Sequence, residues 1–295
     1  MKRFIVCFLL SACIMAGVFA QEQHNFVIDI PYDIYGYEVR TKWAFTEGNR
    51  LIRQAYNVYG EKETAAEGRY TVEYESGVPF LSIVWDDNRR ERYLLLWYNS
   101  YTFILYDSDS NCFMAEPEGI EHYMSDPMAV ATNMSATSSL TEGATVYSPD
   151  ISNLAIGKPW VEGVDGYGIG EKISMDTKGY WGAEALYISI GFVSYSNQQL
   201  YRLNSRPSKI RIHRGSISFD VDLEDTPHFQ RIKLPGVPGW VAGVEPGDGE
   251  LYDRETGTVI ENPQFIQIEI LDVYPGTRWQ DTAINAIFYA TSTWQ

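Results

Sequence analysis

The chain has 295 residues, of which 45% are hydrophobic, 14% aromatic and 21% charged, and its formal net charge is −16. At roughly 100–200 residues per domain, this length accommodates one large or two modest domains with a substantial core. The acidic balance excludes a broad phosphate-binding face, because nucleic-acid-binding proteins need clustered Lys and Arg. The aromatic residues, led by 21 Tyr and 8 Trp, favour an all-β architecture.

Residues 1–20 have the organisation of a secretory signal peptide. A basic start precedes the apolar run 4–19, and Val18-Phe19-Ala20 provides small residues for cleavage after Ala20. The segment Leu10–Cys13 also resembles a bacterial lipobox, so a lipoprotein anchored at Cys13 is the alternative. No later apolar run reaches the roughly 20 residues of a membrane span. We therefore expect a secreted or periplasmic protein without a transmembrane segment.

Only one of the three cysteines lies outside this leader. Cys7 and Cys13 are within it, so an intramolecular disulfide is not expected in the mature chain. The remaining Cys112 lies between acidic residues such as Asp107 and Glu116, whereas a catalytic thiol needs electropositive surroundings. We expect Cys112 to be a small buried hydrophobic residue.

Residues 21–125 are predicted to form a β-rich N-terminal domain of unknown role. Apolar and polar side chains alternate over 70–75, as in a strand with one solvated face. Further strands are predicted at 80–85, 92–98 and 101–106, and the short turns between them indicate an antiparallel meander.

The predicted strand 92–98 has no polar face. Its two sides carry Tyr93, Leu95 and Trp97 on one, and Leu94, Leu96 and Tyr98 on the other. A partner layer or closure into a small barrel must therefore cover the second side. One helix is predicted at 49–59, where Leu51, Ala55 and Val58 share a face.

The second half is predicted to be a β-sandwich or jelly roll. The boundary is placed near 122–135, where strand patterning is weak and turn-forming residues gather. Eight strand-like runs follow within residues 131–295, at 154–160, 171–175, 186–192, 209–213, 218–223, 230–234, 265–273 and 283–289. Such spacing is typical of sandwiches and jelly rolls.

Four stretches of the second half carry a family resemblance through their order and spacing. They are Ser138-Ser139-Leu140 with Tyr147-Ser148-Pro149, then Trp160–Ile173, then Asn204–Ile212, and finally Asp272–Trp279 running into Asp281–Ile284. The segment 131–291 resembles the NADase-type glycan-binding domain, a discoidin-like β-sandwich. The resemblance implies a jelly-roll fold that recognises carbohydrate without catalysis. It does not extend to residues 21–125.

The resemblance does not bring a cofactor with it. Discoidin relatives often hold a structural calcium with an Asp-Gly turn before the Trp-Val-Glu-Gly motif, but here that place reads Leu154–Pro159. The stretch 235–263 looks like an insertion, and its acidic residues Asp248, Glu250, Asp253 and Glu255 lack the EF-hand pattern. The four histidines fall in separate segments, without a zinc-like pair. We expect neither a metal nor a cofactor.

Sugar recognition needs an aromatic face for the C–H surface of the ring, together with fixed polar groups for its hydroxyls. Aromatic candidates in loop-like contexts are Trp160, Tyr167, Trp181, Tyr195, Trp240 and Trp279. Polar candidates are Glu162, Asn204, Arg206 and Arg211. Trp160, Glu162 and Arg206 also lie in the resemblance motifs, so a role in maintaining the fold is open for them.

A cationic stripe stands out in this acidic half. Lys209, Arg211 and His213 alternate with apolar residues and therefore share one face of a predicted strand. The stripe either balances Asp220 and Asp222 across a hairpin or recognises an anionic sugar.

The sequence as a whole predicts a secreted, two-domain, all-β protein whose C-terminal sandwich binds a glycan or glycoconjugate without cleaving it. The main alternative is an envelope or surface protein that uses the same fold to bind another protein. A glycosidase is the third reading. It lacks a local signature, but paired carboxylates are set by distance in space rather than by a motif.

Overall fold

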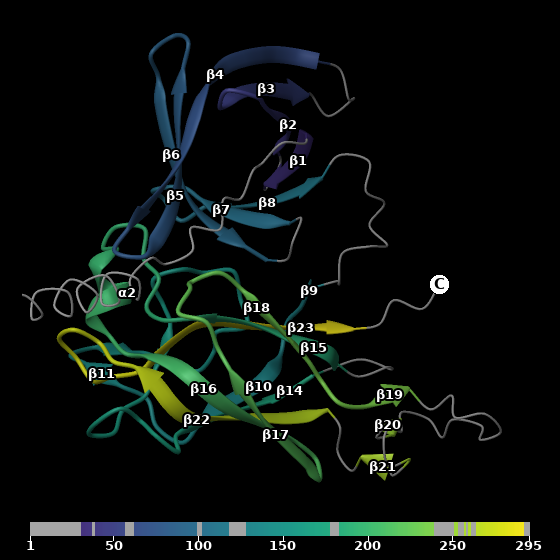
Figure 1. The fold of residues 1–295 in the computed structure, drawn as a ribbon, viewed down its shortest axis with the longest axis vertical. Helices are drawn as coiled ribbons and strands as arrows, with labels where there is room; N and C mark the ends of the chain where they lie inside the picture. The colour runs from purple at the N-terminus through teal and green to yellow at the C-terminus, as the bar shows by residue number, and fades with distance from the viewer. Residues whose placement is uncertain are drawn as a thin grey trace, which may run out of the picture.

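The protein is described from a computed structural model, which defines residues 31–36, 39–56, 62–98, 102–117, 128–177, 183–238, 251–252, 257, 259–260 and 264–291. A closed barrel of eight strands precedes two sheets that pack into a sandwich (Figure 1). The predicted all-β class, with a small barrel before a sandwich, is confirmed. The leader at 1–20, including both cleavage alternatives, lies outside the described residues.

The barrel is an antiparallel meander that closes on itself. Its strands are β1 (Pro31–Gly36), β2 (Val39–Thr46), β3 (Arg50–Tyr56), β4 (Lys62–Glu75), β5 (Val78–Trp85), β6 (Arg90–Trp97), β7 (Phe103–Tyr106) and β8 (Cys112–Pro117). Each strand pairs with the next, and β8 returns to β1. Aromatic rings such as Trp43, Phe45 and Trp85 fill the interior. This packing explains much of the aromatic content of the first half.

The helix predicted at 49–59 is wrong, because its described part is strand β3. Gly48 and Asn49 have φ angles of 71° and 59°, and they turn the chain back so that β3 pairs with β2. β4 pairs along the other edge of β3, and Leu51 is fully buried in the barrel. Pairing on both edges and burial of Leu51 outweigh the helical spacing of three apolar side chains.

The sandwich consists of two five-stranded sheets. The first has the order β10 (Thr132–Ala136), β14 (Lys172–Asp176), β22 (Phe265–Tyr274), β16 (Arg206–Arg214) and β17 (Ile217–Asp222). The second has the order β13 (Trp160–Val161), β23 (Ala283–Thr291), β15 (Ala183–Ile190) and β18 (Gln230–Lys233), with β9 (Met128–Ala129) also paired to β23. Their facing sides form one core, in which Ile210, Ile212, Ile268 and Ile270 are buried, as the alternation predicts.

Short elements complete the described chain. They are the hairpin β11 (Thr141–Glu142) and β12 (Thr145–Val146), helix α2 (Gln199–Leu203), and a small sheet of β19 (Val237–Pro238), β20 (Leu251–Tyr252) and β21 (Val259–Ile260). The small sheet falls within the predicted insertion at 235–263. In the part of the chain that the structure defines, no helix is long and apolar enough to cross a membrane.

The barrel stands on the second sheet of the sandwich (Figure 1). The side chains of Leu94, Leu96 and Tyr98 point away from the barrel interior and pack against this sheet. The rings of Tyr98 and Tyr187 stack with centroids 4.2 Å apart. Both apolar faces of β6 are therefore covered. One face packs in the barrel interior, and the other packs in the junction between the barrel and the sandwich. Residues 118–127, which contain the predicted end of the first domain, lie outside the described chain.

Candidate functional site

Several motif-bearing loops meet at one end of the sandwich, on the left in Figure 1. They are the β13–β14 loop (162–171), helix α2 with the residues after it (199–205), and the β22–β23 connection (275–282). Thr282 Oγ1 donates a hydrogen bond to the Tyr167 carbonyl at 2.8 Å, which joins the first loop to the third. The Ser205 amide donates to the Asp281 carbonyl at 2.9 Å, which joins the second to the third.

Glu162 holds the β13–β14 loop from within. Its side chain is fully buried, and its two carboxylate oxygens accept the amide hydrogens of Val164 at 2.8 Å and Thr282 at 3.1 Å. Burial raises the pKa of Glu162, although the two backbone hydrogen bonds oppose this shift. Since both oxygens serve the backbone, the predicted sugar contact at Glu162 is corrected to a role in shaping the loop.

Trp160 is also a structural residue. Its side chain is fully buried in the sandwich core, and its Nε1–H donates to the Ser138 carbonyl at 2.9 Å. This bond joins two of the motifs that carry the family resemblance. A ring with no exposed face cannot stack on a sugar, so the contact predicted at Trp160 is corrected as well.

Asn204 and Arg206 fix the turn from α2 into β16. Arg206 is 3% exposed, and its guanidinium bonds both carboxylate oxygens of Asp225, at 2.7 and 3.1 Å. Its remaining amino group donates to the carbonyls of Tyr201 and Asn204. The buried Asn204 amide donates to the Leu200 carbonyl at 2.9 Å. With its guanidinium occupied and buried, Arg206 has the structural role that its motif position allowed, and the sugar contact at Asn204 stays a prediction.

Tyr167 and Trp279 differ from these four residues, because both are only half-buried. The Trp279 amide donates to the Leu203 carbonyl at 2.9 Å, and the exposed Arg278 guanidinium lies 4.7 Å from the Trp279 ring centroid. We call Tyr167, Arg278 and Trp279 the loop-end platform. Sequence reasoning missed Arg278, although it stands directly before Trp279 in the last motif.

The cationic stripe is paired with carboxylates. Arg211 bonds both oxygens of Asp220, at 2.6 and 3.2 Å, and Lys209 lies 3.7 Å from the same residue. His213 Nε2 lies 2.9 Å from a carboxylate oxygen of Glu269. Of the two predicted roles, the structure therefore favours charge balance across the hairpin, in which Asp220 occupies the Nε and Nη2 donors of Arg211.

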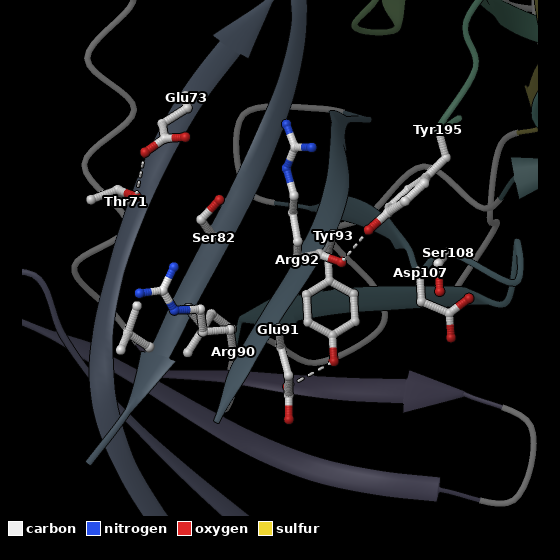
Figure 2. Close-up of a pocket in the computed structure, with 12 residues that line it drawn as sticks. Thr71, Glu73, Ser82, Arg90, Glu91, Arg92, Tyr93, Asp107, Ser108 and Tyr195 are labelled. Carbon is white, nitrogen blue, oxygen red and sulfur yellow. Dashed lines mark hydrogen bonds between the residues drawn. The ribbon is translucent and has the colours of Figure 1, made fainter. Parts of the chain in front are cut away.

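A separate groove of about 680 Å³ crosses β4, β5 and β6 of the barrel and reaches Tyr195 of the sandwich (Figure 2). The Tyr195 ring meets Phe80 edge to face at 5.5 Å, and its hydroxyl donates to the Arg92 carbonyl at 3.1 Å. The structure therefore places Tyr195 here, where the barrel and sandwich meet, and not with the loop-end platform.

The family model of the NAD glycohydrolase translocation F5/8 type C domain matches residues 122–290, which is more than half of the chain. The chain belongs to this family. The match confirms the discoidin-like domain predicted at 131–291. All four motif stretches lie within the F5/8 type C domain, and the buried side chains of Trp160, Glu162 and Arg206 hold its loops.

The other comparisons add little. A solved structure named "Glycoside hydrolase" is similar with a TM-score of 0.34 and 10% identity, over 86% of this chain and 60% of that chain. This chain thus spans less than two thirds of that one, and at this TM-score the likeness carries no argument. No curated protein matches the chain.

The groove beside the F5/8 type C domain contains three carboxylates, two of which have structural partners. Glu91 accepts both guanidinium bonds of Arg53, at 2.7 and 3.1 Å. Asp107 accepts the amide hydrogens of two residues in its own turn. Only Glu73 is bonded to nothing more than a neighbouring hydroxyl, that of Thr71 at 3.1 Å. The lining of the groove therefore does not present two free carboxylates to a glycosidic bond.

Some predicted residues lie outside the described chain. They are Trp181, Trp240 and the acidic residues Asp248, Glu250, Asp253 and Glu255. Within the described residues, no group of three or more His, Cys, Asp or Glu side chains is arranged to hold a metal. Cys112 packs against the barrel–sandwich junction, and burial raises the pKa of its thiol to about 12. Its thiol is therefore protonated near neutral pH and poorly nucleophilic.

Proposed function

We propose that the protein binds a glycan without cleaving it, through the loop-end platform of its F5/8 type C domain. F5/8 type C domains commonly bind carbohydrate, and the family is consistent with an extracellular or surface protein. The observation that carries the proposal is the pair of half-buried aromatic residues Tyr167 and Trp279 on joined loops, with Arg278 exposed beside Trp279. The predicted signal peptide at 1–20 supplies the route of export.

The chemistry of the platform suits a sugar. Aromatic ring faces pack on the C–H surface of a pyranose, and a guanidinium offers several fixed donors to hydroxyls. Beneath the platform, Glu162 and Thr282 tie the loops together through buried or partly buried hydrogen bonds. Loops held in this way lose little conformational freedom on binding, which favours affinity from a small contact area.

The buried position and the backbone hydrogen bonds of Glu162 support binding without cleavage. Glu162 bonds two backbone amides and is buried, whereas a catalytic acid or base must reach the glycosidic oxygen or an attacking water. Glu162 is therefore unsuited to the role of catalytic acid or base, and the groove lining does not present two free carboxylates.

The proposal is tested on a glycan array with the full mature chain. Trp279→Ala and Tyr167→Ala should each weaken binding roughly ten-fold, because each removes an aromatic contact surface. Phe265→Ala is the matched control. This aromatic residue is 46% exposed at the start of β22, the end of that strand away from the platform.

Unchanged binding in the control with loss in both platform variants supports the proposal. A wild-type chain that binds no carbohydrate overturns it, and recovery of a specific envelope protein partner would then establish the interaction alternative.

A further inference from the structure

We propose that the groove on the barrel binds an acidic oligosaccharide, with a carboxylate or sulfate of the sugar held by Arg90. This inference rests on the proposed carbohydrate-binding function, and it adds a second site that lies largely outside the F5/8 type C domain. The groove is lined by Thr71, Glu73, Ser82, Ile83, Val84, Arg90, Glu91, Arg92, Tyr93, Asp107, Ser108 and Tyr195. Its volume of about 680 Å³ is typical of ligand sites.

Strand register places cations and hydroxyls on the floor of the groove. Arg69 pairs with Val84, and Val84 pairs with Arg90, so these three side chains form one row across the strands. Thr71, Ser82 and Arg92 form the next row. Side chains of one cross-strand row point to the same face, here the outer face of the barrel, because Tyr70, Leu81 and Leu95 point inward.

Arg69 and Arg90, the outer residues of the first row, differ from the other described arginines of the barrel in their ion pairing. Four of those others are paired with carboxylates: Arg50 with Glu67 and Asp86, Arg53 with Glu91, Arg89 with Asp87, and Arg92 with Glu75. Arg69 and Arg90 are exposed, and no carboxylate of the described residues lies within ion-pair distance of either.

Two guanidinium groups without a carboxylate partner among the described residues are notable in a chain with a net charge of −16. Their backbones lie about 10 Å apart, two strand spacings, with the apolar Val84 between them. A guanidinium without a carboxylate keeps its donors free for a planar carboxylate or a sulfate. Arg90 therefore marks the anion-binding end of the groove, and Arg69 lies in the same row outside the lining.

The ring of Tyr195 lies toward the other end of the groove. Figure 2 shows Tyr93 and Tyr195 on one side of β6 and Arg90 toward β5. The Tyr93 hydroxyl donates to Glu91 at 2.9 Å, and the hydroxyl of Tyr195 is held by the Arg92 carbonyl. The Tyr93 ring packs against Trp43 and Phe113 of the barrel interior, so Tyr195 is the ring that is fixed on the outer face before a ligand arrives. A sugar ring against Tyr195 and its charged group near Arg90 would span the groove.

The negative charge of Glu73 restricts the chemical class of ligand that the groove can bind. Its exposed carboxylate lies in the same groove, bonded to Thr71 Oγ1. A uniformly charged polyanion would meet repulsion there, whereas sugar hydroxyls can donate to this carboxylate. The groove thus favours a sugar chain with separated acidic groups and free hydroxyls between them.

The groove is built from both halves of the chain. Arg90 belongs to the barrel and Tyr195 to the F5/8 type C domain, so the complete site exists only while the two are docked. The test therefore uses the full mature chain.

Isothermal titration uses two sugar chains with separated acidic groups. A hyaluronan oligosaccharide carries a carboxylate on every second sugar and no sulfate, whereas a κ-carrageenan oligosaccharide carries a sulfate on every second sugar and no carboxylate, and a neutral galacto-oligosaccharide is the reference. Arg90→Glu should weaken binding of the acidic sugar at least roughly ten-fold, through loss of one charge contact and gain of a repulsion. Arg89→Glu is the matched control, because it makes the same charge change at the adjacent residue outside the groove. Thermal melting confirms that both variants are folded, and Arg90→Gln replaces Arg90→Glu should the latter unfold.

Loss in Arg90→Glu with near wild-type binding in Arg89→Glu supports the inference. Equal effects of the two variants overturn it, since the net charge alone would then explain the loss. Binding that ignores Arg90→Glu but is lost in Trp279→Ala also overturns the groove site, while the proposed function stands. A wild-type chain that binds a glycan of the array but none of these acidic sugars overturns the groove site alone, whereas a chain that binds no glycan of the array overturns the proposed function itself.

Discussion

Both the backbone conformation and the packing at position 168 require glycine. Its φ angle is +63°, and a Cβ atom added there would lie 2.4 Å from the Cγ atom of the buried Glu162. The loop that presents Tyr167 can therefore close over Glu162 only with glycine at this position.

Gly168→Ala should destabilise the protein by about 1–2 kcal/mol for the left-handed backbone, plus about 1–3 kcal/mol for overpacking against Glu162. Gly143→Ala separates the two effects, because Gly143 has a similar φ of +60° and no atom within 4 Å of an added Cβ. Urea unfolding should show the larger loss for Gly168→Ala. Equal losses would mean that Glu162 does not constrain the loop.

Two Arg–Asp pairs of similar geometry differ in burial. Asp225 bonds the buried Arg206 through both oxygens, whereas Asp220 bonds the more exposed Arg211 in the same manner. Asp225→Ala should cost about 3–5 kcal/mol, because it leaves Arg206 buried without a counter-charge. Asp220→Ala should leave the unfolding midpoint within experimental error. Similar losses in the two variants would contradict this assignment.

The same pair predicts a pH dependence. Burial alone would raise the pKa of Asp225, but the bonds from Arg206 and Arg202 outweigh it, so the pKa lies below 3.8. A lowered carboxyl pKa adds stability above the unfolded value, and this contribution is lost as the pH falls below about 3.8 toward the folded pKa. Asp225→Asn should flatten this acid limb in urea titrations. A wild-type acid limb in Asp225→Asn would refute the linkage.

At the scale of single elements, β6 determines how the molecule is assembled. Leu95 and Trp97 fill the barrel, while Leu94 and Leu96 fill the junction with the sandwich. The Trp97 amide also donates to His228 Nδ1 at 3.1 Å, and its carbonyl accepts the Phe229 amide hydrogen. One strand thus couples the two halves through both its side chains and its backbone.

Leu96→Asp should separate the unfolding of the barrel from that of the sandwich, because it buries a carboxylate in an apolar junction. Differential scanning calorimetry should then show two transitions. Val84→Asp is the control, since Val84 lies on the same outer face of the barrel but is 44% exposed. A single wild-type-like transition in Leu96→Asp would contradict the coupling role of β6.

The sequence could predict that both faces of 92–98 need cover, because side-chain alternation is a local property. It could not predict that a distant sheet covers one of them, since that contact joins residues such as Tyr98 and Tyr187 from separate domains. The helix predicted at 49–59 failed for the same reason, because strand pairing across the barrel is not visible in local spacing.

The candidate site was predicted less well than the fold. Motif position and aromatic type gave the same signal for the buried Trp160 and the half-buried Trp279. In a sequence, the alternation of apolar and polar residues along a strand distinguishes core positions from surface positions. Loops lack this alternation. The sequence could not predict that Arg90 has no carboxylate partner among the described residues, because this depends on which carboxylates the barrel fold brings close to it.

At the scale of the whole molecule, the acidic charge is unevenly balanced. The cations of the sandwich stripe are paired with carboxylates, whereas Arg69 and Arg90 of the barrel have no carboxylate partner in the part of the chain that the structure describes. The loop-end platform and this groove lie in different parts of the protein, one at the end of the sandwich and one at its junction with the barrel. If both sites bind as proposed, a long sugar chain or two separate glycans would engage them.

The central claim is that the protein binds a glycan and leaves it intact. The most direct measurement titrates the full mature chain with the best array ligand, and then determines the mass of the recovered ligand after prolonged incubation. The account predicts saturable binding that Trp279→Ala weakens, and a ligand of unchanged mass. Recovery of shortened sugar chains, or saturable binding that is indifferent to both Trp279→Ala and Tyr167→Ala, would contradict it.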